Sequence, residues 1–282
     1  MSAASGLAVV DAHFVVAADD AHHLAIFACG SSDDGRTLRV LVGDLPNDPR
    51  ERKARKPDFE ALTLLPATGA LPNGALLAVG SGSTPNRDLA VVIELDAFGR
   101  LTDHVHRRSL SPFYDPLREG VGDVNIEGAF ILDGELVLLS RANGSVPDNH
   151  IAHVALDAVA PWLEGTSSAR VEPKSVTAFR IGEIGGVPLG VTDGAPHPNG
   201  GWVFSAAAED TADSYNDGAV AGAAVGVVDS RGEVLYLARL EPDAKVEGIV
   251  ASVLGGRTVL TMVTDGDDPD LPASLLVAVL PE

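Results

Sequence analysis

A five-residue pattern that recurs along the chain is the feature that most restricts its fold. The pattern is a polar or basic residue, an apolar residue, Glu, a small residue and an apolar residue, and it occurs at 58–62, 125–129 and 245–249. A degraded copy at 4–7 has Ser in the Glu position, and a further copy at 189–193 lacks the Glu. Repeats spaced by tens of residues are typical of solenoids and propellers. The chain is therefore predicted to consist of several similar units.

The spacing of the copies predicts the number of units. Markers placed at 5, 60, 127, 191 and 247 are separated by 55, 67, 64 and 56 residues. Five copies in 282 residues average about 56 residues each, which fits a propeller blade of four strands and their loops. We predict one domain over residues 1–282, a β-propeller of five blades. Six blades of about 47 residues and a double-layer sandwich remain alternatives.

Short apolar runs bounded by turn residues predict an all-β fold. Val, Ile, Leu and Phe dominate runs such as 13–18, 89–95 and 258–263, which end near Gly, Asp, Asn or Pro. Such runs are the usual signal for strands. No stretch of about 12 residues shows helical periodicity, and the best candidate, 155–165, is interrupted by Pro161.

Charge and cysteine content exclude several classes of protein. The chain has 40 acidic and 20 basic residues, a formal charge of -20, and one cysteine. A nucleic-acid-binding protein needs a basic face, and a disulfide framework needs several cysteines.

The N-terminus lacks the basic start of a secretion signal, and the longest apolar run, 219–228, is about half of a membrane span. We expect a cytoplasmic protein that binds neither nucleic acids nor membranes.

Acidic residues are predicted to gather at one end of the propeller axis. Neighbouring strands in a blade are antiparallel, so the start of the innermost strand lies beside the end of the second strand. The first set of acids is Glu60, Glu127 and Glu247, and the second set includes Asp19, Asp20 and Asp210. The sequence therefore predicts an acidic channel mouth.

The predicted mouth could balance its charge in three ways. A hard cation such as Ca²⁺ takes carboxylate oxygens as ligands. Alternatively, arginines could pair with two of the acids, or each Glu could accept backbone N–H bonds and close a turn. The predicted metal ligands are Asp19, Asp20, Asp193 and Asp210. The predicted ligand-binding residues are Glu60, Glu127, Glu247, Ser81, Arg87 and Arg141.

Two further segments could attract an anion. Residues 80–87 contain glycines and hydroxyls whose backbone N–H groups could surround an anion together with Arg87, although a tight turn explains the same residues. Residues 50–56 hold five of the 20 basic side chains and could steer an anionic ligand to the mouth, or could be a solvated connection. We expect a small-molecule partner, with an anion as one option.

Three phrases, at 56–62, 80–87 and 125–129, form a combination that is specific when taken together. The chain resembles, over most of its length, a bacterial β-propeller family of unassigned function that is distantly similar to phytase-like esterase propellers. This resemblance implies a propeller with a polar channel mouth. In phytase-like relatives, calcium ions held by acidic residues help to bind and hydrolyse phosphate esters.

Two classes of function follow. The first is a binding propeller whose mouth takes a small ligand, with Ca²⁺ as a candidate cofactor. The second is a metal-dependent hydrolase of phosphate or carboxylic esters, in which the cation polarises the ester and a channel Glu activates water. The chain contains no Gly-x-Ser-x-Gly nucleophile elbow. The sequence therefore favours binding and leaves enzymatic activity undecided.

Overall fold

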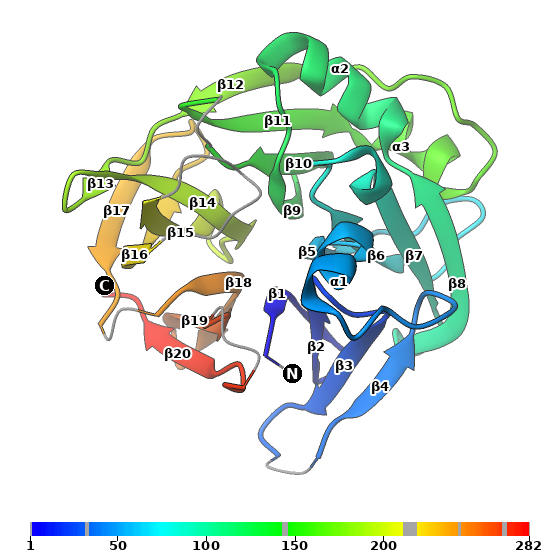
Figure 1. Cartoon of the computed structure of the whole chain (residues 1–282), viewed down its shortest axis with the longest axis horizontal. Helices are drawn as coiled ribbons and strands as arrows, with labels where there is room; N and C mark the ends of the chain where they lie inside the picture. Colours follow the sequence, from blue (N-terminus) through cyan, green and yellow to red (C-terminus); the bar gives the residue numbers. More distant parts are fainter. Residues whose placement is uncertain are drawn as a thin grey trace.

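Five small antiparallel sheets form a ring around a common axis (Figure 1). The computed structural model describes residues 2–31, 34–142, 146–210, 219–241, 244–266 and 270–281. Each sheet is built from strands that are consecutive in the sequence. The fold is an all-β propeller of five blades, as predicted, and neither six blades nor a sandwich is observed in the described chain.

The blades follow one another along the chain. Blade 1 contains β1 (Ala4–Val10), β2 (His13–Ala18), β3 (His23–Ala28) and β4 (Arg36–Arg39). Blade 2 contains β5 (Phe59–Leu65), β6 (Ala75–Gly80), β7 (Leu89–Leu95) and β8 (Leu101–Ser109). Blade 3 contains β9 (Ile126–Leu132), β10 (Glu135–Ser140), β11 (Asn149–Ala155) and β12 (Ser175–Phe179). Blade 4 contains β13 (Glu183–Ile184), β14 (Val187–Pro196), β15 (Trp202–Asp210), β16 (Ala219–Val228) and β17 (Val234–Arg239). Blade 5 contains β18 (Val246–Leu254), β19 (Arg257–Thr264) and β20 (Leu275–Val279).

The apolar runs become the inner part of each blade. Strands β1, β5, β9, β14 and β18 are innermost and contact one another around the ring. Strands such as β6 are buried along their whole length, because both of their faces pack against neighbouring blades. A continuous apolar run is the pattern expected for a strand covered on two sides. The outermost strands, such as β17, alternate between exposed and partly buried residues.

Three α-helices were not predicted from the sequence: α1 (Pro49–Arg55), α2 (Ser111–Val121) and α3 (Leu156–Leu163). Each is shorter than the length over which helical periodicity is clear, and α2 and α3 contain Pro116 and Pro161. Most of the basic segment is thus the helix α1, which has no buried residue and fits the alternative of a solvated connection. Of the helices in the described residues, none is long and apolar enough to cross a membrane.

Blades 1 and 5 close the ring without sharing a sheet. Within the described residues, one isolated backbone bridge, Ala3 with Asp265, lies between these two blades. A small apolar cluster that includes Leu7, Val16 and Val263 fills the contact. Closure of the ring therefore depends on the packing of a few side chains.

Candidate functional site

The repeated sequence pattern corresponds to a β-bulge in every inner strand. In each blade, the pairing between the inner strand and the next strand skips one residue of the inner strand. The skipped residues are Ser5, Glu60, Glu127, Thr192 and Glu247. The fourth marker, predicted at 191, is therefore Thr192. A bulge re-aims the side chain of the extra residue, and we call the end of the axis where the bulges lie the acidic end.

Two of the bulge residues carry hydroxyl groups that connect neighbouring blades. Ser5 Oγ donates a hydrogen bond to the carbonyl oxygen of Phe59. Thr192 Oγ1 donates to the carbonyl oxygen of Val246 at 2.6 Å. Each acceptor directly precedes the bulge of the next inner strand. The two hydrogen bonds therefore link blade 1 to blade 2 and blade 4 to blade 5.

Asp193 connects blades 4 and 5 in a similar way. Its Oδ1 accepts the Gly194 N–H at 2.7 Å and its Oδ2 accepts the Ile249 N–H at 2.9 Å. Burial raises the pKa of Asp193 well above its usual range, although both backbone hydrogen bonds oppose the shift. Both oxygens of this carboxyl group therefore bond the backbone.

Five charged residues from blades 1 and 2 form what we call the Lys56 cluster: Asp19, Lys56, Asp58, Glu60 and Arg87. Asp19 follows β2, Lys56 follows α1, and Glu60 lies on β5. Lys56 Nζ forms ion pairs with Asp19 and, at 2.8 Å, with Asp58 Oδ1. Arg87 Nη1 lies 2.8 Å from Asp58 Oδ2. Two cations thus converge on Asp58.

Asp58 is held in place by its backbone and its side chain. Its φ of 57° is left-handed, a conformation that Asp tolerates better than most residues. Its N–H donates to the Asp19 carbonyl oxygen, and its own carbonyl oxygen accepts the Ser81 N–H, both at 2.9 Å. Ser81 Oγ also donates to Asp58 Oδ2. Asp58 therefore joins the ends of β2 and β6.

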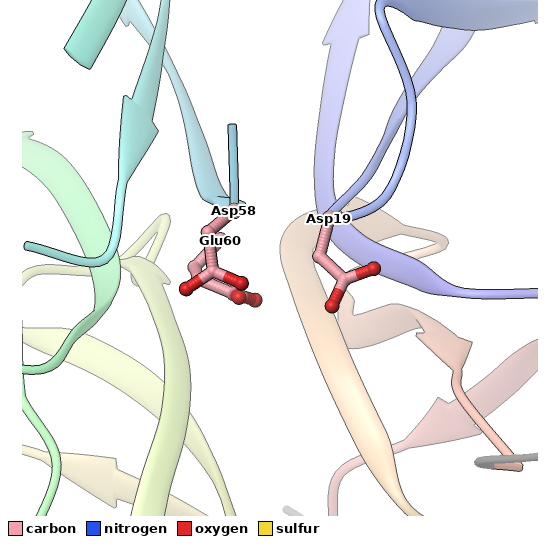
Figure 2. A group of neighbouring side chains, drawn as sticks. All are labelled: Asp19, Asp58 and Glu60. Atoms are coloured by element: carbon pink, nitrogen blue, oxygen red, sulfur yellow. The ribbon is translucent and has the colours of Figure 1, made fainter. Parts of the chain in front are cut away.

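Glu60 has a different environment. Its carboxylate has no hydrogen bond or ion pair in the described part of the chain. One oxygen each of Asp19, Asp58 and Glu60 lie within 4.8 Å of one another, and Figure 2 shows Asp58 and Glu60 on one side with Asp19 opposite. Three carboxylate oxygens at these separations could ligate a hard cation.

A second group draws on blades 3, 4 and 5, and we call it the Arg141 cluster: Glu127, Arg141, Glu209, Lys245 and Glu247. Arg141 Nη2 lies 3.1 Å from Glu209 Oε2, and Arg141 Nη1 lies 3.9 Å from Glu127 Oε1. Lys245 Nζ lies 3.1 Å from Glu209 Oε1 and 3.1 Å from Glu247 Oε1. Among the described residues, Glu247 Oε2 is buried without a hydrogen-bond partner.

Burial makes Glu127 and Glu247 of the Arg141 cluster weaker acids than usual. It raises the pKa of Glu127 to about 8, although the charge of Arg141 opposes the shift. It also raises the pKa of Glu247, although Lys245 and Arg141 oppose that shift. The Glu127 carboxyl group can therefore exchange a proton near neutral pH.

Burial also raises a carboxyl pKa in the Lys56 cluster. Burial raises the pKa of Glu60 well above its usual range, and the charges of Asp58 and Glu127 raise it further. Burial favours the neutral amine of Lys56, but the charges of Asp19 and Asp58 outweigh burial and raise the pKa of Lys56. Lys56 is therefore an ammonium ion bound by carboxylates.

The two clusters together contain more acids than bases. They hold six carboxyl groups and four cationic side chains. Full ionisation would leave an excess of two negative charges in a largely buried region. Protons can remove that excess, as the raised pKa values of Glu60 and Glu127 indicate, and so can a divalent cation.

The predicted ligand-binding residues divide between the clusters. Glu60, Arg87 and Ser81 lie in or against the Lys56 cluster, and Glu127, Arg141 and Glu247 lie in the Arg141 cluster. Of the three predicted ways to balance the acids, pairing with arginine is observed, but mainly with acids that were not predicted. Arg87 pairs with Asp58 and Arg141 with Glu209, and Arg141 also lies 3.9 Å from the predicted Glu127.

The predicted metal ligands do not form one group. Asp19 lies in the Lys56 cluster, whereas Asp20 pairs with Arg52 at 3.1 Å, and Asp193 bonds the backbone. The side chain of Asp210 lies outside the described residues. The structure brings Asp19 together with Asp58 and Glu60 instead.

Four cluster residues were missed as site residues, and the repeat contained a signal for two of them. Asp58 and Lys245 both occupy the first, polar position of the five-residue pattern. Lys56 lies at the end of the basic segment, outside the five-residue pattern. Glu209 lies on β15 directly before the predicted Asp210.

Solved structures with a related arrangement include two arabinanases and a luciferin-regenerating enzyme. The α-L-arabinanase of Cellvibrio cellulosa has a TM-score of 0.46 and 10% identity, and the match covers 96% of this chain and 89% of that chain. The Bacillus subtilis arabinanase has a TM-score of 0.41 and 10% identity, covering 99% and 96%. The luciferin-regenerating enzyme has a TM-score of 0.45 and 10% identity, covering 95% and 72%.

Sequence comparison gives one family. None of the curated proteins compared with this chain matches it. Residues 52–269 match the profile of a family of unknown function, DUF6910. The matched segment contains 218 of the 282 residues and carries both ion-pair clusters apart from Asp19. The predicted resemblance to a propeller family of unassigned function is thereby confirmed: the chain belongs to the DUF6910 family.

Proposed function

We propose that the acidic end binds a small ligand through a divalent cation, with Ca²⁺ as the leading candidate and Asp19, Asp58 and Glu60 as its ligands. The observation that supports this most is the Glu60 carboxylate, which has no bonded partner in the described residues and lies within 4.8 Å of two other carboxylates. Carboxylate oxygens are the ligands that Ca²⁺ prefers.

Lys56 would compete with this cation. Its ammonium group pairs with Asp19 and Asp58, so a bound cation has to displace it from the same oxygens. The displaced ammonium, together with Arg87, would then lie beside the cation. That arrangement suits a small anionic ligand. We also propose that the protein is cytoplasmic.

Calcium titration tests the proposal. We expect Ca²⁺ to bind the protein in calorimetry and to raise its melting temperature. Glu60→Gln should weaken binding about tenfold or more, because it removes an anionic ligand. Lys56→Met should tighten binding by a similar factor, because it removes the competing ammonium. Lys174→Met is the control, since Lys174 is 59% exposed and pairs with Glu135. Both residues belong to blade 3, whereas the Lys56 cluster belongs to blades 1 and 2. Equal Ca²⁺ affinity in all four proteins would contradict the proposal.

Ester hydrolysis is the second candidate function, and one observation favours it. Burial raises the pKa of Glu127 to about 8, and a general base or acid works best when its pKa lies near the working pH. A cation at the Lys56 cluster would polarise the ester while Glu127 takes a proton from water.

A panel of phosphate and carboxylic esters tests this candidate. Hydrolysis should stop when EDTA removes the metal, and Glu127→Gln should lower kcat about 100-fold or more. Ca²⁺ binding without hydrolysis of any ester would leave binding as the function. Hydrolysis that survives both EDTA and Glu127→Gln would contradict the proposed roles.

A further inference from the structure

A cavity lies at the opposite end of the axis from the ion-pair clusters. Its volume is about 570 Å³, and all five inner strands line it through residues 7–9, 62–64, 129–131, 194–196 and 249–252. Each of these segments begins two residues after the bulge of its strand. The inner strands therefore run from the acidic end to this cavity, and every blade contributes to its wall.

Among the described residues, the wall of the cavity carries no ionisable acid or base other than a thiol. Nineteen described residues line it, and none of these is Asp, Glu, Lys, Arg or His. Because 21% of the chain is charged, about four charged residues would be expected among nineteen if charges were spread evenly. Leu, Ile, Val, Ala and Phe supply most of the wall, and Val9 and Leu64 are 40% and 41% exposed. The cavity is the apolar counterpart of the acidic end.

One polar side chain in the wall offers a hydrogen-bonding group. Thr63 is a lining residue, and its hydroxyl group makes no hydrogen bond within the described residues. The hydroxyl oxygen is not among the side-chain atoms that are shut off from solvent without a partner. It can therefore bond water, or a ligand with one hydrogen-bonding atom that displaces this water.

We propose that this cavity binds a small, neutral, mostly apolar molecule that carries one hydrogen-bonding group. Its volume falls within the range of about 300–1,000 Å³ that is typical of small-molecule sites, whereas a protein partner needs a surface of about 800 Å². Apolar walls favour an apolar ligand by removing its surface from water. An ion would lose its hydration without gaining a counter-charge.

A neutral fluorescent molecule, N-phenyl-1-naphthylamine, tests the proposal. We expect saturable binding to one site with a blue-shifted, stronger emission. Leu64→Glu should weaken binding about tenfold or more, because it introduces a charge into the wall. Leu254→Glu is the matched control: Leu254 lies at the end of β18, is 73% exposed and does not line the cavity. Glu60→Gln should leave this binding unchanged, which separates this proposal from the cation site.

Cys29 gives a second measurement that needs no substitution. It is the one cysteine of the chain, it is exposed, and it contributes to the cavity wall. Bound N-phenyl-1-naphthylamine should slow the alkylation of Cys29 by N-ethylmaleimide in proportion to occupancy. The pH must be constant, because burial raises the pKa of the thiol and only the thiolate reacts.

Three results would overturn the proposal. The first is emission that rises without saturation, and the second is an equal affinity in Leu64→Glu and Leu254→Glu. The third is a concentration-dependent dimer in sedimentation that Leu64→Glu abolishes, since that would assign the apolar wall to a second copy of the chain.

Discussion

Replacing Arg141 with Met is expected to lower the free energy of unfolding by about 3–5 kcal/mol, because it leaves buried carboxylates without their cation. Arg141 lies 3.1 Å from Glu209 and 3.9 Å from Glu127, and its side chain is 11% exposed. Lys245 would remain as the second partner of Glu209, but its charge is shared with another carboxylate. Urea denaturation of the variant and the parent protein measures the difference.

Arg180→Met is the matched control for this substitution. Arg180 also pairs with a carboxylate, Asp148 at 2.7 Å, but its side chain is 78% exposed. Exposed ion pairs contribute little to stability, so the control should denature at nearly the same urea concentration as the parent. If both variants lost the same free energy of unfolding, burial would not make the ion pairs of Arg141 more important for stability than exposed ion pairs.

Glu127→Gln is expected to remove a fall in stability between pH 4.5 and pH 8. In the unfolded chain Glu127 loses its proton near its usual pKa of 4.5, whereas in the folded chain burial raises that pKa to about 8. The folded state therefore holds the proton more tightly, and its stability falls as the pH rises through this window. At pH 8 the variant should be more stable than the parent by a few kcal/mol.

Urea denaturation at a series of pH values gives the profile. Glu119→Gln is the control, because Glu119 is exposed and its hydrogen bond with Arg170 lowers its pKa. The control should retain the fall toward pH 8 that the parent shows. A Glu127→Gln profile with the same slope as the parent would mean that Glu127 ionises at its ordinary pKa.

The repeat made the propeller predictable, since bulges recur where the five-residue pattern recurs. What a repeat describes is the common part of the blades, so features that occur once were missed. Helices α2 and α3 belong to this class, and they pack on the outside of blades 2 and 3 (Figure 1). The rings of Phe113 of α2 and Trp162 of α3 meet edge to face, with their centroids 4.8 Å apart. Their stability comes from this tertiary packing, which local periodicity does not report.

Four of the six acids and both arginines of the candidate site were predictable, whereas Asp58, Glu209 and the two lysines were not. Glu60, Glu127 and Glu247 share one position in the pattern, so the sequence itself aligned them. Lys56 directly follows α1 and pairs with Asp19, which follows β2 and lies 37 residues earlier in the chain. Pairings of this kind depend on the position of side chains from different blades, and no spacing within one segment reports them.

The junction between the first and last blades affects how the molecule can open. Every other pair of adjacent blades is tied by a peptide segment, while in the described chain this pair is held by the packing of β1 on β18 and β19, one backbone bridge and a small apolar cluster. Because no covalent connection joins these two blades, local separation should begin there. Ser5 and Glu247 lie on the two strands that meet at this boundary, so its opening would expose two of the five bulge positions to solvent.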